Sequence, residues 1–244
     1  MKVSKKEDWE ALLTLAESGD DKSQYEIGLY FENGETNIVE QNLSKAFEWY
    51  QKAHENGNID ATIRVADFLS EGICCKQDID LAIKLYNIGI NNESGIASHN
   101  LATIYRDKQD FEQAFRLYKK TQKLEKTYPM ALAFCYYYGI GTSEDKNKAM
   151  KIFLNISKGK TKHGNSPYEI DNANYYLGKI YLEGKIVSKS LEKARYYLEL
   201  ANKENDHNSA NELLLVIGRN PVGKRKKPNK RAANVLPLST PSDF

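Results

Sequence analysis

One frame of small and apolar residues recurs five times along this 244-residue chain, and it limits the possible folds more than any other feature. The last copy is the plainest, with Ala173, Leu177 and Tyr181 spaced four residues apart. That spacing places the three side chains on one face of a helix. Gly178 lets a second helix approach closely, and Gly184 ends the first helix. Each copy therefore predicts a helix, a turn and a second helix.

Two positions mark the frame in every copy. The small residue of the first helix is Gly28, Ala66, Ala102, Ala133 or Gly178, at intervals of 38, 36, 31 and 45 residues. The alanine that opens the second helix is Ala46, Ala82, Ala114, Ala149 or Ala194. In the third copy Lys108 stands where a glycine is expected, which predicts a shorter turn. A polar loop, residues 159–171, lengthens the last interval.

The segments on either side of the five copies predict single helices that cover the open faces of the first and last copy, as a repeat array requires. The fold class predicted is all-α, a right-handed α-solenoid of about five helix-turn-helix repeats with a capping helix at each end. The predicted repeats lie near residues 23–60, 61–96, 97–127, 128–160 and 173–204, and the caps at 4–19 and 207–218. Residues 219–244 are predicted to form a separate, basic, proline-containing disordered tail.

The frame resembles the Sel1-like repeat, a relative of the tetratricopeptide repeat, over roughly Trp9 to Gly218. The first copy carries the motif of the second helix in full, Lys45-Ala46-x2-Trp49-Tyr50-x-Lys52-Ala53. The third copy lacks the Gly-x-Gly loop, and the fourth has Tyr128 where alanine is expected. The resemblance implies a non-enzymatic adaptor, assembly factor or scaffold without a cofactor. It also implies that the first helix of each pair lines the concave side of the solenoid.

A partner-binding face follows from that implied geometry. Positions out of phase with the buried leucines and tyrosines of the first helices would line it, and tyrosine and arginine among them are favoured interface anchors. The predicted partner-binding residues are Tyr25, Leu29, Ile63, Asp67, His99, Thr103, Arg106, Phe134, Tyr137, Tyr138, Tyr175 and Lys179. An alternative is that Tyr137 and Tyr138 only fill an irregular fourth repeat.

Catalytic and metal-binding patterns do not stand out in the sequence. The four histidines are dispersed, and none has ligand spacing to a cysteine or to a second histidine. Gly139-Ile-Gly141 follows a predicted helix and not a strand, so it is interpreted as the turn of the repeat and not as a phosphate loop. The three cysteines, Cys74, Cys75 and Cys135, are expected to be reduced, buried thiols. We therefore predict no enzyme activity, no cofactor and no metal.

Charge is divided unevenly along the chain. Residues 219–244 contain seven lysines or arginines and one acid, whereas the other 218 residues contain 28 bases and 32 acids. The basic cluster consists of Lys224, Arg225, Lys226, Lys227, Lys230 and Arg231. It could contact nucleic-acid phosphates, act as a nuclear address, or only improve solubility. A further apolar stretch, residues 235–238, could add contact with a partner.

These observations favour a scaffold or adaptor that binds a protein or peptide on the concave face. One alternative is an immunity or inhibitor protein that neutralises a toxin or enzyme, for which an acidic body would suit a basic target. Another is a nucleic-acid-associated protein that binds through the basic tail. Hydrophobic residues make up 41% of the chain, but no run is long enough to span a membrane, and no secretory signal is evident. A cytoplasmic location is expected, or a nuclear one if the cell has a nucleus.

Overall fold

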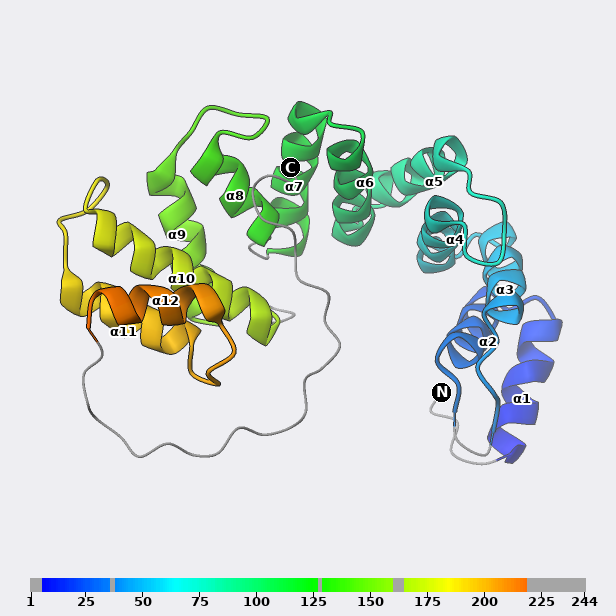
Figure 1. Cartoon of the computed structure of the whole chain (residues 1–244). Helices are drawn as coiled ribbons and strands as arrows, with labels where there is room; N and C mark the ends of the chain where they lie inside the picture. The colour runs from blue at the N-terminus through cyan, green and yellow to red at the C-terminus, as the bar shows by residue number, and fades with distance from the viewer. Residues whose placement is uncertain (1–5, 36–37, 127–128, 160–164, 219–244) are drawn as a thin grey trace. The chain divides into compact units, whose positions relative to one another are not determined.

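The computed structural model describes residues 6–35, 38–126, 129–159 and 165–218 (Figure 1). Within these ranges the chain forms twelve α-helices and no strand beyond an isolated bridge between Glu35 and Val39. The helices are α1 (Lys6–Glu17), α2 (Asp21–Asn33), α3 (Leu43–Glu55), α4 (Ile59–Glu71), α5 (Ile79–Asn91), α6 (Gly95–Asp107), α7 (Phe111–Glu125), α8 (Met130–Tyr138), α9 (Lys146–Ser157), α10 (Pro167–Glu183), α11 (Leu191–Ala201) and α12 (Asn208–Val216). The predicted all-α class and the five helix pairs are confirmed.

The pairs are α2–α3, α4–α5, α6–α7, α8–α9 and α10–α11. We call the first helix of each pair the A helix and the second the B helix.

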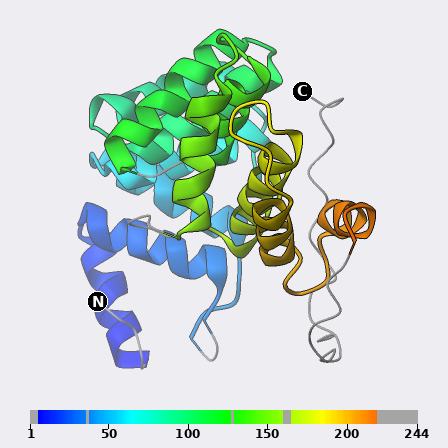
Figure 2. The ribbon, with the colours of Figure 1, turned by 90° about the vertical axis from the view of Figure 1, so that its left-hand side faces the viewer.

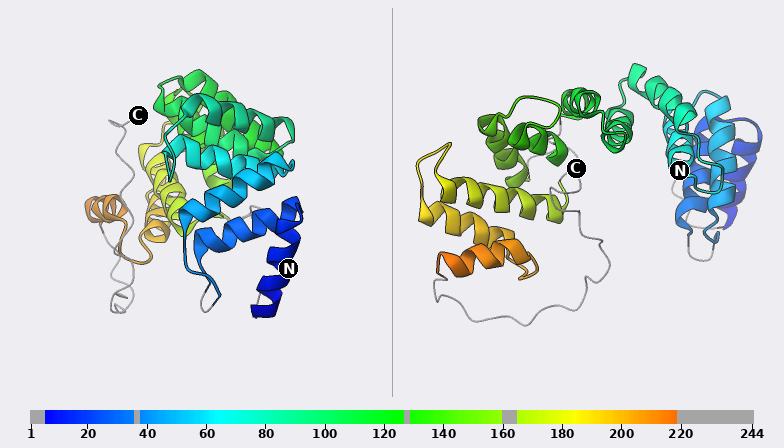
Figure 3. Two further views of the ribbon diagram at one scale, coloured as in Figure 1. Left: turned by 90° about the vertical axis from the view of Figure 1, so that its right-hand side faces the viewer. Right: turned by 45° about the horizontal axis from the view of Figure 1, so that its top comes forward.

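The chain divides into two compact units, residues 1–103 (unit 1) and 104–244 (unit 2), and each is described by itself. In unit 1 consecutive helices from α1 to α5 pack on one another, and in unit 2 those from α7 to α12 do (Figures 2 and 3).

A polar cap starts every B helix four residues before its buried alanine. The capping residues are Asn42, Asp78, Asp110, Asp145 and Ser190, and each side chain accepts a hydrogen bond from the third backbone amide of the helix. Such a cap satisfies one of the amides that a helix start leaves without a partner. The following alanines are almost fully buried, with exposed fractions of 0 to 2%. The fixed cap-to-alanine spacing therefore sets where each B helix begins and which side it buries.

Close approach between the helices of a pair explains the small residue in the A helix. A Cβ atom on Gly28 would lie 2.4 Å from Cε1 of Tyr50, and one on Gly178 would lie 2.6 Å from Cγ of Leu198. Both distances are too short for real atoms, so only glycine allows these B-helix side chains to lie against the A helix. The predicted close packing at Gly28 and Gly178 is confirmed.

The third pair has the shorter turn that its missing glycine predicts. Helix α6 ends at Asp107, α7 begins only a few residues later at Phe111, and Gln109 takes the left-handed conformation with a φ of 60°. In the fourth pair Gly141 has a φ of 66°, and its backbone lies against the carbonyl group of Phe111 at the start of α7. The Gly-x-Gly loop is thus part of the packing between the third and fourth pairs.

A helix packs on each end of the array. Leu12 and Ala16 of α1 form a buried cluster with Ile27 of α2, and Ala210 and Leu214 of α12 form one with Leu198 and Ala201 of α11. These packed ends match the two capping helices that the sequence predicts. Tyr128 and the basic tail, residues 219–244, lie outside the described residues.

Candidate functional site

A polar network joins three consecutive A helices in unit 1. The guanidinium group of Arg64 on α4 donates hydrogen bonds to Glu32 on α2 and to Oδ2 of Asp67, the latter at 2.5 Å. The Nδ2 amide of Asn100 on α6 donates to Oδ1 of Asp67 at 2.8 Å. We call Glu32, Arg64, Asp67 and Asn100 the polar ladder. It spans the A-helix side of unit 1 and is held by direct charge-assisted bonds.

Two buried tyrosines of the B helices donate hydrogen bonds to the carboxylates of the polar ladder. Tyr50 Oη donates to Oε2 of Glu32 at 2.5 Å, and Tyr86 Oη donates to Oδ1 of Asp67 at 2.7 Å. Burial, followed by interaction with Glu32, raises the pKa of Tyr50, and burial followed by Asp67 raises that of Tyr86. Both hydroxyls therefore keep their protons and hold the two carboxylates in place.

The ladder carries more negative than positive charge and remains open to solvent. The side chains of Arg64, Glu32 and Asp67 are 29%, 21% and 15% exposed. Burial opposes the charged form of Arg64, but Asp67 and Glu32 outweigh this effect and raise its pKa, so the guanidinium stays charged. The half-buried ring of Tyr25 lies 5.7 Å from that of Tyr50, and burial together with nearby Asp60 raises the pKa of Tyr25. The ladder thus holds one cation between two carboxylates.

In unit 2 the A helices carry a cluster of aromatic side chains where those of unit 1 carry the polar ladder. The aromatic cluster consists of Phe134, Tyr137 and Tyr138 of α8, Phe153 of α9, and Tyr175 and Tyr176 of α10. The Oη atoms of Tyr138 and Tyr176 are 2.9 Å apart, and the rings of Phe153 and Tyr176 stack with centroids 5.1 Å apart. Phe153 and Tyr137 are buried, and edge-to-face and stacked contacts of this kind hold the other, half-buried rings in rigid positions.

Charged groups surround the aromatic cluster. The ammonium groups of Lys146 and Lys179 lie 5.3 Å and 5.9 Å from the ring centroids of Tyr137 and Tyr176. Burial, with Glu183 as the next cause, raises the pKa of Tyr137. One turn before Tyr175, burial and the nearby Asp206 and Glu204 raise the pKa of Asp171 to about 6. The A-helix side of unit 2 therefore combines aromatic rings with mixed charge.

The structure corrects two of the twelve predicted partner-binding residues. Ile63 and Tyr137 are each only 4% exposed and belong to the core. Ile63 turns toward α5, where its Cγ1 atom would lie 3.0 Å from a Cβ atom on Gly89. The space that Gly89 leaves is filled by Ile63, so the next residue, Arg64, takes the surface position. Tyr137 lies beneath Tyr138, and their ring centroids are 4.9 Å apart.

The other ten predicted residues are at least partly accessible. His99 is exposed, and the remaining nine, Tyr25, Leu29, Asp67, Thr103, Arg106, Phe134, Tyr138, Tyr175 and Lys179, are half-buried. The structure brings Tyr25 and Asp67 to the ladder, and it brings Phe134, Tyr138 and Tyr175 into the aromatic cluster. The first helices of the pairs thus supply both surfaces.

Sequence reasoning missed Glu32, Arg64, Asn100 and Tyr176. Arg64 gave one usable signal, because it is the one charged residue in the mostly apolar run Ala61-Thr-Ile-Arg-Val-Ala66. A charge in such a run needs partners, and Glu32 on the preceding A helix is one of them. Asn100 and Tyr176 carried no local signal, because their partners lie 33 and 38 residues away in sequence.

Other chemical groups offer little within the described residues. No cluster of three or more histidine, cysteine or acidic side chains there could hold a metal ion. No helix of the described part combines the length and the apolar character needed to cross a membrane. Cys135 is buried, and burial raises its pKa to about 12, but Cys74 is exposed and Cys75 half-buried. The prediction that all three thiols are buried is therefore wrong for Cys74, which lies in the turn after α4.

Comparison with known proteins agrees with this architecture. The Sel1 repeat matches residues 21–58, 59–93, 96–121, 130–154 and 171–206. The Sel1-repeat-containing protein YjcO of Escherichia coli is 27% identical over 203 residues, covering 79% of this chain and 82% of its own, and a YjcO protein of Shigella flexneri matches equally. A Sel1 repeat protein structure from Oxalobacter formigenes has a TM-score of 0.66 and 20% identity, covering 82% of this chain and 79% of its own.

Proposed function

Because the chain belongs to the Sel1 repeat family, whose members generally bind protein partners, we propose that it is a scaffold or adaptor that grips a protein or peptide with its A helices. Repeats of this fold are typically non-catalytic. The observation that carries the proposal is the polar ladder, a solvent-open network that holds side chains from three successive A helices in fixed positions.

Preorganisation makes the A-helix side suited to binding. Ordering free side chains at an interface costs about 0.5–1.5 kcal/mol for each flexible residue. Glu32 and Asp67 are already held by Arg64 and by the buried tyrosine hydroxyls, so this cost is largely met before a partner arrives. The aromatic cluster of unit 2 supplies rigid rings, which are common anchors of protein interfaces.

The charge of the A helices favours a basic partner. Helices α2, α4 and α10 each carry three acidic residues and one basic residue. Complementary charge speeds association and discriminates between partners. This acidity also favours the more specific function of an immunity or inhibitor protein that occupies a basic toxin or enzyme. The cellular location and nucleic-acid binding by the tail stay predictions from the sequence.

Affinity capture from native lysate with matched variants tests the proposal. The A-helix variant carries Leu29→Lys and Glu183→Lys, which place positive charge where a basic partner would bind, and the control carries Glu48→Lys and Glu192→Lys on B helices. We expect the control to retain the partner protein seen with the unchanged chain and the A-helix variant to lose it, with equal circular dichroism for all three. Loss of the partner in the control alone would refute binding through the A helices.

A further inference from the structure

Two B helices of unit 2 are strongly basic, unlike the other B helices. Helices α7 and α9 together contain seven lysines or arginines and two glutamates. In α3, α5 and α11 the lysines and arginines are equal in number to the acids. Position in the repeat does not explain the difference, because all five B helices share one frame. The positive charge is a property of this part of the chain.

Several of these charges are not neutralised by neighbours. Arg116 pairs with Glu112, Lys146 with Glu144 and Lys148 with Asp145. By contrast Lys120, Lys123 and Lys151 are exposed and form no ion pair with the described residues. Lys119 likewise forms no ion pair with the described residues. Its ammonium group lies 5.5 Å from the ring centroid of Phe115. Four lysines are thus available to an anionic partner.

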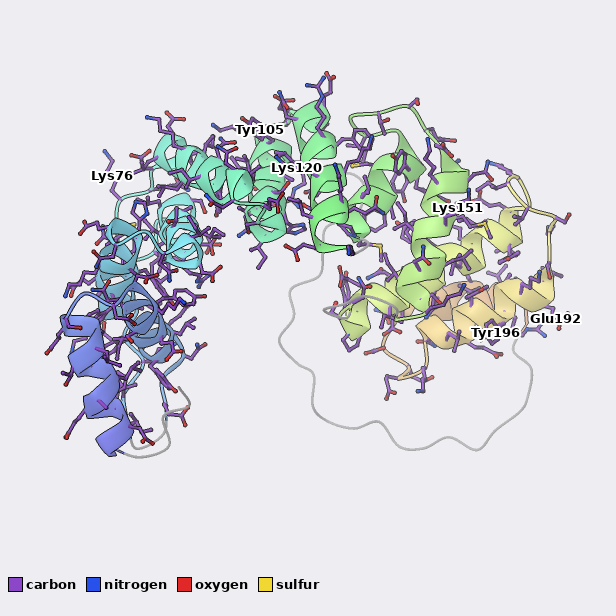
Figure 4. All side chains as sticks on the ribbon, turned by 180° about the vertical axis from the view of Figure 1, so that it is seen from behind. Lys76, Tyr105, Lys120, Lys151, Glu192 and Tyr196 are labelled. Carbon is purple, nitrogen blue, oxygen red and sulfur yellow. The ribbon has the colours of Figure 1, made fainter. Side chains whose placement is uncertain are left out.

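Aromatic contacts make the two helices parts of one surface. Phe115 of α7 meets Tyr136 of α8 edge to face, with ring centroids 5.3 Å apart. The ammonium group of Lys148 on α9 in turn lies 5.3 Å from the ring centroid of Tyr136. A continuous series of contacts therefore runs from Lys119 on α7 to Lys148 on α9. Figure 4 labels Lys120 and Lys151, which are seen from the same side of unit 2. We call Lys119, Lys120, Lys123 and Lys151 the lysine face.

We propose that the lysine face binds the phosphate backbone of nucleic acid without sequence preference. Lysine binds a phosphate as a mobile point charge, which suits a backbone contact that does not depend on sequence. The only arginine in α7 and α9 is Arg116, which is already paired. A nucleic-acid backbone carries one negative charge per nucleotide and releases counterions when lysines neutralise it, so four unpaired lysines favour it as the anionic partner.

A membrane surface is the less favoured anionic partner. Interfacial helices combine basic residues with large exposed apolar side chains that enter the lipid. The large exposed apolar residues among the described residues lie on other helices, at Leu15, Leu81, Ile88, Ile96, Tyr168, Leu191, Tyr196, Leu215 and Val216. Neither α7 nor α9 contributes one. The lysine face thus offers electrostatic contact without an apolar anchor.

Fluorescence anisotropy of a labelled 20-nucleotide RNA, titrated with the full chain from 50 to 200 mM salt, tests this inference. The test variant changes Lys119, Lys120, Lys123 and Lys151 to glutamine, and the control changes Lys45, Lys52, Lys84 and Lys193, four exposed lysines of other B helices. We expect the control to bind as the unchanged chain does. The test variant should bind at least about tenfold more weakly, and its slope of log affinity against log salt should fall by up to about 3.

A third variant separates the lysine face from the basic tail by changing Lys224, Arg225, Lys226, Lys227, Lys230 and Arg231 to glutamine. The inference requires that this variant still responds to the four lysine-face changes. Equal binding by test and control variants would overturn it, as would RNA binding that depends on the tail alone. Binding only to phosphatidylserine vesicles or to polyglutamate, and not to RNA, would also overturn it. Capture of the A-helix partner should be the same in all these variants.

Discussion

Arg64 is the residue on which the polar ladder depends, because it neutralises two half-buried carboxylates at once. Changing Arg64→Gln leaves Glu32 and Asp67 without their cation, and we expect the free energy of unfolding to fall by about 1–2 kcal/mol. Urea denaturation at pH 7 measures this. Arg116→Gln is the control, because it breaks an exposed pair with Glu112 and should cost less than about 0.5 kcal/mol. Equal losses in the two variants would contradict the role given to the ladder.

Asp171 predicts a pH dependence of stability. Burial and the nearby Asp206 and Glu204 raise its folded pKa to about 6, above the ordinary value of 3.8. Between pH 4 and 6 the folded state keeps a proton that the unfolded state has lost, so this group lowers stability as the pH rises, with the full penalty above pH 6. Asp171→Asn should therefore stabilise the protein at pH 7, by less than about 1 kcal/mol because the group is partly solvated.

Denaturation of the Asp171→Asn variant and the unchanged chain at pH 4, 5, 6 and 7 checks this. The gain should shrink toward zero near pH 4. Gln51→Asn, an exposed change on α3 that removes no titratable group, should give no such trend. A gain that is constant with pH would show that the substitution acts by some route other than the proton on Asp171.

At the scale of the helices, the Gly-x-Gly turn of the fourth pair makes a sharp prediction. A Cβ atom on Gly141 would lie 1.9 Å from the carbonyl oxygen of Phe111, whereas one on Gly159 meets nothing within 4 Å. Both residues have left-handed backbones, with φ values of 66° and 61°. Each alanine variant should lose about 1–2 kcal/mol from the backbone alone, and Gly141→Ala should lose more because α7 must move.

Thermal and urea unfolding of the Gly141→Ala and Gly159→Ala variants separates the two effects. Circular dichroism in the native buffer shows whether helix content is retained. If both variants lose the same stability, the contact between the Gly141 turn and α7 does not contribute to packing.

The spacing of residues within one helix pair predicts the repeat frame but not the partner-binding positions. The frame of Gly28, Gly178 and the five alanines depends on close packing inside one pair, so local spacing was enough to find it. The partner-binding positions depend on the next pair as well. At α4 the side that faces solvent is shifted by one residue, because Gly89 on α5 makes room for Ile63 and leaves Arg64 on the surface. No pattern within α4 contains that information.

Over the whole molecule, opposite charges are carried by different helices. The formal net charge is only +2, but α2, α4 and α10 are acidic whereas α7 and α9 are basic. An even spread of charge would serve solubility alone. The separation supports two binding surfaces with different chemistry, a protein-binding one on the A helices and a phosphate-binding one on the lysine face.

Site-specific photo-crosslinking tests the central proposal, binding through the A helices, most directly. A benzophenone amino acid is placed at Leu29 or Lys179 on A helices, and at Lys52 or Glu192 on B helices, in the full chain. After irradiation in native lysate, mass spectrometry identifies the crosslinked proteins. We predict that Leu29 and Lys179 capture a protein that neither B-helix position captures. Capture of the same protein only from Lys52 or Glu192 would contradict binding through the A helices.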